Sequence, residues 1–227
     1  MFYRHRRFDH WIDRGGNTYQ GLQFDQCDFV MCAISLTENP ANRSCACDVL
    51  LRDCTNAGLS VGPALFESVV VENLRSQSGT IVSGAAFKHC TFRGHVGRLI
   101  VNNCLGYPFS QMAVDSYNFA NTTYYKSVDW ALDIRDACFT DAALRIPARL
   151  IRRNTHTSVV VTKARLSNDS WKAADYSKAP WIKTAIELLS SDCHREDEVF
   201  VAPLALPTEA RCALDVFEQL KSLGVGE

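Results

Sequence analysis

The sequence lacks a charge excess of either sign, because 24 lysines and arginines are balanced by 25 aspartates and glutamates, for a net charge of −1. That balance argues against a nucleic-acid coat protein and against an acidic mimic of DNA. No uninterrupted apolar run approaches the roughly 18 residues that a membrane-spanning helix needs. The first ten residues carry charges where a secretion signal needs an apolar stretch, so we expect a cytoplasmic protein.

Several motifs that signal phosphate binding, catalysis or metal binding are also missing. There is no glycine-rich loop of the Walker or dinucleotide type, and no Cys-x-x-Cys pair begins a zinc site. His194 and Glu196 have the spacing of half a zinc-deaminase motif, but no Pro-Cys-x-x-Cys segment follows them. We therefore predict no catalytic residue, no metal and no cofactor.

What the chain does have is a repeat of five residues, clearest from Cys47 to Ser76. Apolar or small residues recur there at every fifth position, namely Val49, Cys54, Leu59, Ala64, Val69 and Leu74. A period of five fits neither the helical period of 3.6 nor the strand period of 2. The repeat predicts a solenoid in which each five-residue unit forms one side and about twenty residues complete a four-sided turn.

A second inward position is expected two residues before each of these centres. In this stretch it holds Cys47, Arg52, Ala57, Gly62, Glu67 and Glu72. The pattern resembles a degenerate form of the pentapeptide-repeat family, as do Gly84–His89, Gly97–Ile100, Asp129–Asp133 and Pro147–Arg153, which look like segments of bacterial pentapeptide-repeat-like proteins. The resemblance implies a mainly β fold, a right-handed quadrilateral β-helix. Family members are usually non-catalytic, and some act on DNA gyrase as acidic mimics of duplex DNA.

Further units precede and follow this stretch. The other predicted centres are Phe24, Phe29 and Ile34, then Val82, Phe87 and Phe92, and finally Ile134, Phe139 and Leu144. The ten residues 37–46 contain turn formers and are interpreted as a loop that replaces two sides and preserves the phase. Residues 103–131 interrupt the repeat, and a short helix is predicted from Ser110 to Lys126, with its aromatic side chains packed on the solenoid.

The repeat also explains half of the ten cysteines. Without a secretion signal, disulfide bonds are not expected. A buried thiol behaves as a compact apolar side chain. We assign Cys54 to a central position, and the small inward position to Cys27, Cys32, Cys47 and Cys90.

The two ends of the chain depart from the repeat. Residues 1–21 mix basic and aromatic side chains, which predicts a cap on the solenoid, with binding of single-stranded nucleic acid as the alternative. We assign residues 1–146 to the solenoid and 147–227 to an α+β subdomain packed on it. In that subdomain we predict paired strands at 148–153 and 158–163, a helix at 181–189, a strand at 199–201 and a helix at 208–223 that begins with Thr208 as N-cap.

The most promising polar surface begins at Lys88. The favoured interpretation is a solvated face with ordinary ion pairs, whereas the alternative is a basic stripe for an acidic partner or a phosphate. The candidate binding residues are Lys88, His89, Arg93, His95, Arg98, Asp129, Trp130, Arg149, Arg152 and Arg153.

The sequence is compatible with three functions. The leading hypothesis is a non-enzymatic module, associated with immunity or defence, that docks a protein partner on the solenoid wall. The alternative is an enzyme or small-ligand-binding protein with a pocket between insertion 103–131 and the solenoid, lined by Arg93, His95, Asp129 and Arg149. A gyrase-targeting DNA mimic comes third, because the charge balance disfavours it. No nucleic-acid or membrane partner is expected, and a homodimer is compatible with the sequence.

Overall fold

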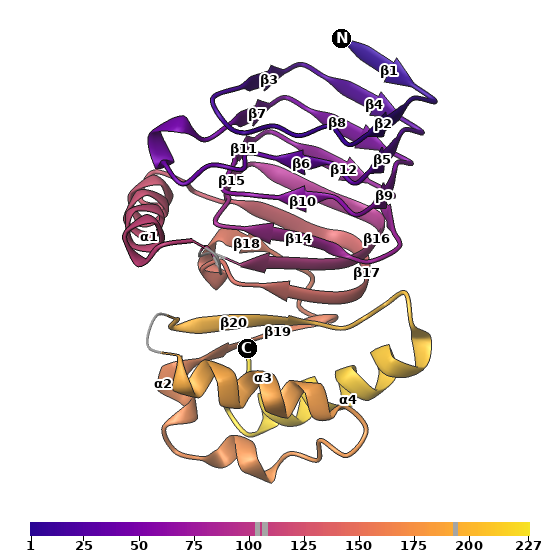
Figure 1. Cartoon of the computed structure of the whole chain (residues 1–227). Coiled ribbons are helices and arrows are strands. Elements are labelled where there is room, and N and C mark those ends of the chain that lie inside the picture. Colours follow the sequence, from indigo (N-terminus) through magenta and orange to yellow (C-terminus); the bar gives the residue numbers. More distant parts are fainter. Residues whose placement is uncertain (103–104, 106–108, 193–194) are drawn as a thin grey trace.

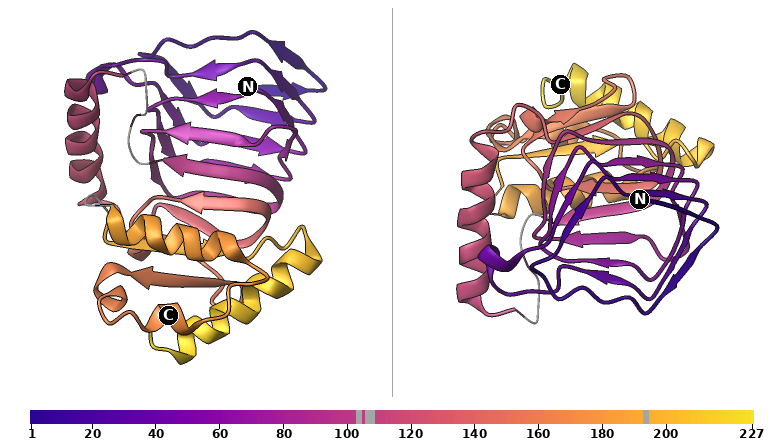
Figure 2. Two further views of the ribbon diagram at one scale, coloured as in Figure 1. Left: turned by 60° about the horizontal axis from the view of Figure 1, so that its bottom comes forward. Right: turned by 90° about the horizontal axis from the view of Figure 1, so that it is seen from above.

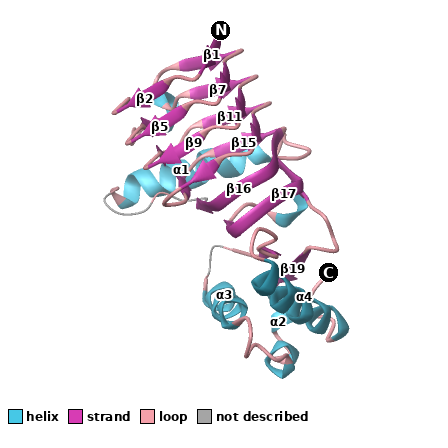
Figure 3. Ribbon diagram, turned by 90° about the vertical axis from the view of Figure 1, so that its right-hand side faces the viewer, coloured by secondary structure: helices cyan, strands magenta, loops and turns pink. Residues whose placement is uncertain are grey.

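The computed structural model describes residues 1–102, 105, 109–192 and 195–227. The chain is mainly β, with short parallel strands stacked in a regular pattern (Figure 1). This arrangement is compatible with a β-solenoid. The C-terminal helices lie at the end of the stack opposite the N-terminus (Figure 3).

From β1 to β16, consecutive strands along the chain fall in different sheets, so the stack grows turn by turn. One path of a twelve-stranded sheet holds β1 (Phe2–Arg4), β4 (Gln23–Asp25), β8 (Leu50–Arg52), β12 (Val70–Glu72) and β16 (Cys90–Asn102). That sheet continues from β16 through β14 (Thr80–Ser83), β10 (Ser60–Val61) and β6 (Ala33–Ile34). A four-stranded sheet holds β3 (Thr18–Gln20), β7 (Cys45–Cys47), β11 (Leu65–Glu67) and β15 (Ala86–Lys88). Another holds β2 (Arg7–Asp9), β5 (Asp28–Val30), β9 (Thr55–Ala57) and β13 (Arg75–Ser76).

The corners between these strands are formed by residues in the left-handed region of backbone space. Asp48, Asp53, Ser68 and Asn73 have φ between 52° and 55°, and Gly58 has φ 89°. A positive φ turns the chain sharply, and Asp and Asn tolerate it better than most other residues. Because such residues recur about every five positions, the chain changes direction at that interval, which is the physical origin of the repeat.

Two side chains of each five-residue unit point inward, one at the strand centre and one two residues earlier. Leu51 pairs with Phe24, so Leu51 is a strand centre, whereas Val49 occupies the earlier position. The predicted register from Cys47 to Ser76 is therefore wrong by two residues. The predicted centres are buried or half-buried at the small position, and the true strand centres are Leu51, Asn56, Val61, Phe66 and Val71.

The assignment of Cys47 to the small inward position is wrong for the same reason. Cys47 is only half-buried at the end of β7, and Arg52, which the predicted register also places inward, is exposed. Cys54 is fully buried, but at the small position and not at a centre. Cys27, Cys32 and Cys90 are buried at the small position, as predicted.

The loop before β7 causes this shift. Partners across it are 27 residues apart, as in Gln23 with Leu50, whereas Leu50 pairs with Val70 only 20 residues later. The loop thus adds seven residues, which is not a multiple of five, and the predicted phase-preserving loop is wrong. A 3-10 turn, Pro40–Asn42, lies within it.

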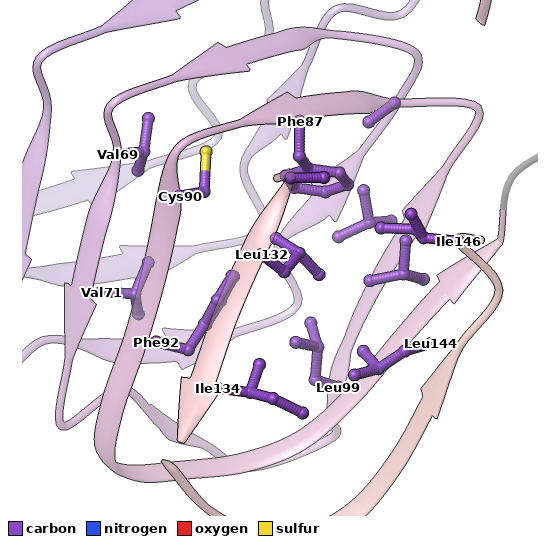
Figure 4. Packing of buried hydrophobic residues seen from close by; sticks show 14 of the residues in the cluster. Val69, Val71, Phe87, Cys90, Phe92, Leu99, Leu132, Ile134, Leu144 and Ile146 are labelled. Atoms are coloured by element: carbon purple, nitrogen blue, oxygen red, sulfur yellow. The ribbon is translucent and has the colours of Figure 1, made fainter. Parts of the chain in front are cut away.

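The later units agree with the prediction. Buried side chains include Val82, Phe87 and Phe92, and then Ile134, Phe139 and Leu144 of β17 (Leu132–Leu144). Figure 4 shows how Phe87, Phe92, Ile134 and Leu144 pack inside the stack. β16 and β17 are each 13 residues long and pair along most of their length. β16 therefore extends past Gly97, where the repeat was expected to stop, and it pairs with both β12 and β14.

The predicted excursion is the helix α1 (Gln111–Tyr125), and the Ser110 side chain caps its N-terminus as expected. The helix runs along the side of the stack (Figure 2). Its buried aromatic residues anchor it there: the Tyr117 hydroxyl donates to the Thr37 carbonyl at 3.1 Å, and the Phe87 N–H donates to the Tyr125 hydroxyl at 3.2 Å. The two interruptions of the repeat therefore pack against each other.

The C-terminal part has a hydrophobic core of its own, centred on residues such as Ile182, Ile186, Phe200 and Phe217. Its elements are β18 (Ile151–Arg152), β19 (Ser158–Thr162), α2 (Lys163–Leu166), α3 (Pro180–Ser191), β20 (Asp197–Val201) and α4 (Pro207–Ser222), with 3-10 turns at Ala148–Leu150 and Ser170–Ala173. β19 pairs with β20, and β20 joins β17 through Val199 and Leu144.

Two details of this part differ from the prediction. β18 pairs with β17 and not with β19, because the chain adds one more parallel strand to the stack before it enters the C-terminal part. The N-cap of α4 is Leu206 and not Thr208, since Pro207 occupies the first turn. Ala213, Val216, Phe217 and Leu220 form the buried stripe of this helix.

A glycine substitution tests how closely consecutive turns approach. A Cβ on Gly62 would lie 2.4 Å from the Ser35 carbonyl oxygen, whereas one on Gly21 would meet nothing within 4 Å. Gly21→Ala bears only the cost of a positive φ, about 1–2 kcal/mol. Gly62 does not have a positive φ, so Gly62→Ala bears only the cost of the close approach, and we expect it to lower the free energy of unfolding by ~1–3 kcal/mol, measured by urea denaturation. No measurable loss in Gly62→Ala would contradict this packing.

A buried carboxylate joins the first turn of the stack to the loop. Asp13 is 3% exposed and accepts hydrogen bonds from the Gly15 N–H at 2.8 Å, Asn17 Nδ2 at 2.6 Å and the Ser35 N–H at 3.1 Å. Burial acts to raise the pKa of Asp13, but these bonds and one from Ser44 outweigh it, so the pKa lies below its usual value.

This lowered pKa gives a pH-dependent stability. The ionised Asp13 contributes stability above the unfolded-state pKa of about 3.9, and the contribution is lost as the pH falls through the lower folded-state pKa. Asp13→Asn removes the titration. We expect the difference in unfolding free energy between the wild type and this variant to shrink between about pH 6 and pH 3. A difference that stays constant over that interval would refute the assignment.

Candidate binding surface

The candidate surface begins at the corner between β15 and β16. His89 occupies this corner with φ 55°, and its N–H donates to the Trp130 carbonyl at 3.2 Å. The next N–H, of Cys90, donates to the Ala131 carbonyl at 2.9 Å. The chain that returns from the insertion is thus fixed beside the strand stack by backbone hydrogen bonds.

Three side chains from separate segments stack at this corner. The ring centres of His89 and Trp130 are 4.8 Å apart with the planes tilted by 31°, and the Arg152 guanidinium carbon lies 4.1 Å from the Trp130 ring centre. We call this group the corner stack. A guanidinium over an indole face is attracted by the ring quadrupole. The half-buried indole is thereby held in one orientation at the surface.

Acidic groups neutralise the basic side chains around the corner stack. His89 Nε2 lies 2.6 Å from Asp129 Oδ1, and this contact holds the pKa of Asp129 below its usual value. Lys88 forms an ion pair with Glu67, which raises the pKa of Lys88. Arg135 forms a bidentate pair with Asp133, the strand partner of Arg152. The corner combines an aromatic anchor with paired charges and has no free excess of positive charge.

A row of alternating charges crosses the adjoining outer face of the stack. We call it the ladder, and its members in register are Arg4, Asp25, Arg52, Glu72, Arg93 and Asp136. Ion pairs link Arg4 to Asp25 at 3.0 Å, and Glu72 to both Arg52 at 3.2 Å and Arg93 at 3.1 Å. Arg93 is therefore one member of a balanced row.

The remaining predicted residues lie elsewhere. Arg98 pairs with Asp141 at 2.9 Å, and the His95 N–H donates to Asn73 Oδ1 at 3.1 Å. Arg149 is exposed, and Arg153 donates to the Glu227 carbonyl at 3.1 Å. Carboxylates lie beside Lys88, His89, Arg93 and Arg98, as on a solvated face with ordinary ion pairs and not as in a continuous basic stripe.

Sequence reasoning missed the buried contact between the two interruptions. Arg43, 8% exposed, donates to Asn121 Oδ1 at 2.9 Å, and its guanidinium carbon lies 5.0 Å from the Tyr117 ring centre. Burial lowers the pKa of Arg43. No local pattern could pair residues 78 positions apart. The ladder, by contrast, follows from the strand register once the length that the loop before β7 adds is known.

The described part of the junction between α1 and the stack is filled by Tyr117, Asn121 and Tyr125. Elsewhere, a void of about 130 Å³ with a mainly apolar lining lies inside the stack, and a cleft lies beside Trp171, Tyr176, Lys183 and Glu187. Neither cavity is lined by the residues predicted for a ligand pocket, which were Arg93, His95, Asp129 and Arg149.

One pattern typical of hydrolases does occur in the stack. Residues Gly58 to Gly62 match Gly-x-Ser-x-Gly. A nucleophile elbow of that kind needs a strand-to-helix turn, whereas Ser60 begins β10 between two parallel neighbours. Within the described residues, no three His, Cys, Asp or Glu side chains are arranged to hold a metal ion.

No protein-family model matches the chain, and no curated protein matches it. None of the helices in the described part of the chain has the length and apolar character needed to cross a membrane.

The corner stack can be tested by a double-mutant cycle. We expect Arg152→Ala and Trp130→Ala together to show a coupling free energy of about 0.5–1 kcal/mol in urea unfolding, as for an exposed cation–π pair. Arg75→Ala, an exposed arginine on β13, serves as the matched control with Trp130→Ala and should show no coupling. Additive losses for Arg152 and Trp130 would contradict the contact.

Proposed function

We propose that the strand stack is a right-handed quadrilateral β-helix of the pentapeptide-repeat type. Partner residues 20 or 21 apart, as in Leu50 with Val70 and Val70 with Thr91, support four five-residue sides per turn. Two inward positions per unit and corners with positive φ support the same interpretation. We assign residues 1–146 to this part and 147–227 to the α+β part that packs on it.

The function that the surface supports best is that of a non-enzymatic protein-binding module. The corner stack is the observation that carries this proposal, because Trp and Arg are the residues that most often dominate binding energy at protein interfaces. Trp130 is fixed in orientation by His89 and Arg152, so little conformational entropy is lost when a partner covers it. The role in immunity or defence rests on the family resemblance alone.

The two competing functions have less support. A ligand site between the insertion and the stack needed a pocket, whereas the described side chains fill that junction. A DNA mimic needs a row of carboxylates at phosphate-like spacing, whereas the ladder alternates in sign.

The test is capture of a partner from the host, with photo-cross-linking from the exposed position 135, which lies beside the corner stack and leaves His89, Trp130 and Arg152 unchanged. We expect a cross-link to a defined protein, and we expect Trp130→Ala or Arg152→Glu to reduce capture of that protein by about tenfold or more. Arg75→Glu, an equal change of charge on β13, should leave capture unchanged. Capture that is equal in all variants, or no protein above background, would count against the proposal.

A further inference from the structure

Positions at equal distances from the two ends of the ladder carry charges of opposite sign. From β1 to β17 the charges are positive at Arg4, Arg52 and Arg93, and negative at Asp25, Glu72 and Asp136. The first and sixth positions therefore have opposite signs, as do the second and fifth and the third and fourth. A face with this property is complementary in charge to its own reversed copy.

Stacking within one chain explains part of this pattern. Like charges directly opposite each other on adjacent strands destabilise a sheet, so alternation is favoured in a single molecule. The alternating charges form ion pairs between adjacent strands of one chain, since Glu72 contacts both Arg52 and Arg93. These arginines are nevertheless about half exposed, with side-chain exposures of 48% and 47%, and can accept a second acidic neighbour.

A second row on the same strands has matching symmetry. In register with each other are Gln23, Leu50, Val70 and Thr91. The half-buried apolar residues Leu50 and Val70 are adjacent at the middle, and polar Gln23 and Thr91 flank them. An apolar centre with a polar rim is typical of a protein interface. The row's outer ends, Phe2 and Asp133, are not complementary and lie at the edge of the face.

We propose that this face, made by the outer sides of β1, β4, β8, β12, β16 and β17, binds a second copy of the chain. The twofold axis runs parallel to the strands, between β8 and β12, so that the two stacks are antiparallel. Each Leu50 then faces Val70 of the second copy, and each Arg52 faces Glu72 of the second copy. Asp25 faces Arg93, and Arg4 faces Asp136.

The opposite choice of axis is excluded by charge. A twofold axis that runs along the ladder, parallel to the stack, would place each ladder residue against its own equivalent, so that like charges would face each other along the whole row. Such contacts are strongly unfavourable at an interface. In a symmetric dimer the same patch is used on both chains, and only the antiparallel arrangement makes this patch self-complementary.

The area of the face determines how tightly the two copies are expected to bind each other. Six strands at about 4.8 Å spacing span roughly 24 Å, which is at the small end for specific interfaces. We therefore expect a weak dimer that dissociates as salt screens the exposed charges. The inference goes beyond the proposed function, because it concerns the ladder and leaves Trp130 and Arg152 available to another partner.

Two charge variants test the arrangement. Asp25→Lys with Glu72→Lys makes the first five ladder positions positive, and Arg52→Glu with Arg93→Glu makes the last five negative. Each variant alone should self-associate at least about tenfold more weakly than the wild type, because four of its six facing pairs become repulsive. Mixed together, the two variants place opposite charges at all six pairs, as the wild type does. Because five like charges in each variant are no longer neutralised by neighbours in the same chain, we expect a heterodimer tighter than the wild-type dimer.

The readout is sedimentation velocity over a range of protein and salt concentrations, with far-UV circular dichroism as the check that each variant is folded. Asp9→Lys with Asp28→Lys, on the strands β2 and β5, makes the same change of net charge on another sheet as the first variant and should retain wild-type association. A heterodimer in the mixture supports the proposal even if the wild-type dimer is too weak to observe. Folded variants that do not pair when mixed, or a wild-type dimer that persists in both variants, would overturn it.

Discussion

The corner at about every fifth residue is the constraint on which the structure depends. Where residues such as Asp53 and Asn73 adopt a positive φ, the chain turns and the next strand begins in another sheet. Parallel pairing to the next turn then fixes which side chains point inward. A thiol, a valine or an alanine can fill the small position, but a residue that breaks the spacing shifts everything after it. The loop before β7, which adds seven residues to its turn of the stack, does this.

In-register stacking acts on the outside of the molecule as well as on its core. Equivalent positions of successive turns are neighbours, so their side chains form continuous rows. Inside, polar residues are tolerated where they find partners, as Asn56 does with Thr80 at 2.8 Å. Outside, charged residues alternate in sign from Asp25 to Arg93. One geometric rule therefore accounts for an apolar interior, a balanced outer row and the absence of a basic stripe on that row.

Much of the fold could be predicted from local pattern, and the failures have identifiable causes. The helix after Ser110 and the inward residues Val82, Phe87 and Phe92 were predictable, because capping and spacing act over a few residues. The register after Cys47 was not, since a loop length that is not a multiple of five leaves no mark in the sequence around it. The pairing of β19 with β20 was missed because it spans the whole of α3, and a nearby turn offered a simpler partner.

The sequence by itself determined the five-residue repeat, the list of side chains able to form a site and the near-zero net charge, because these depend on composition and on neighbours along the chain. Only the tertiary structure decided which of those side chains meet. His89, Trp130 and Arg152 come from three segments and are brought together by successive turns of the stack. Arg93 and Arg98 acquire acidic partners from other strands, so they form ion pairs and not a continuous basic stripe. Charge and contact at a surface depend on distance in space, and a parallel stack sets that distance between residues some twenty or more positions apart.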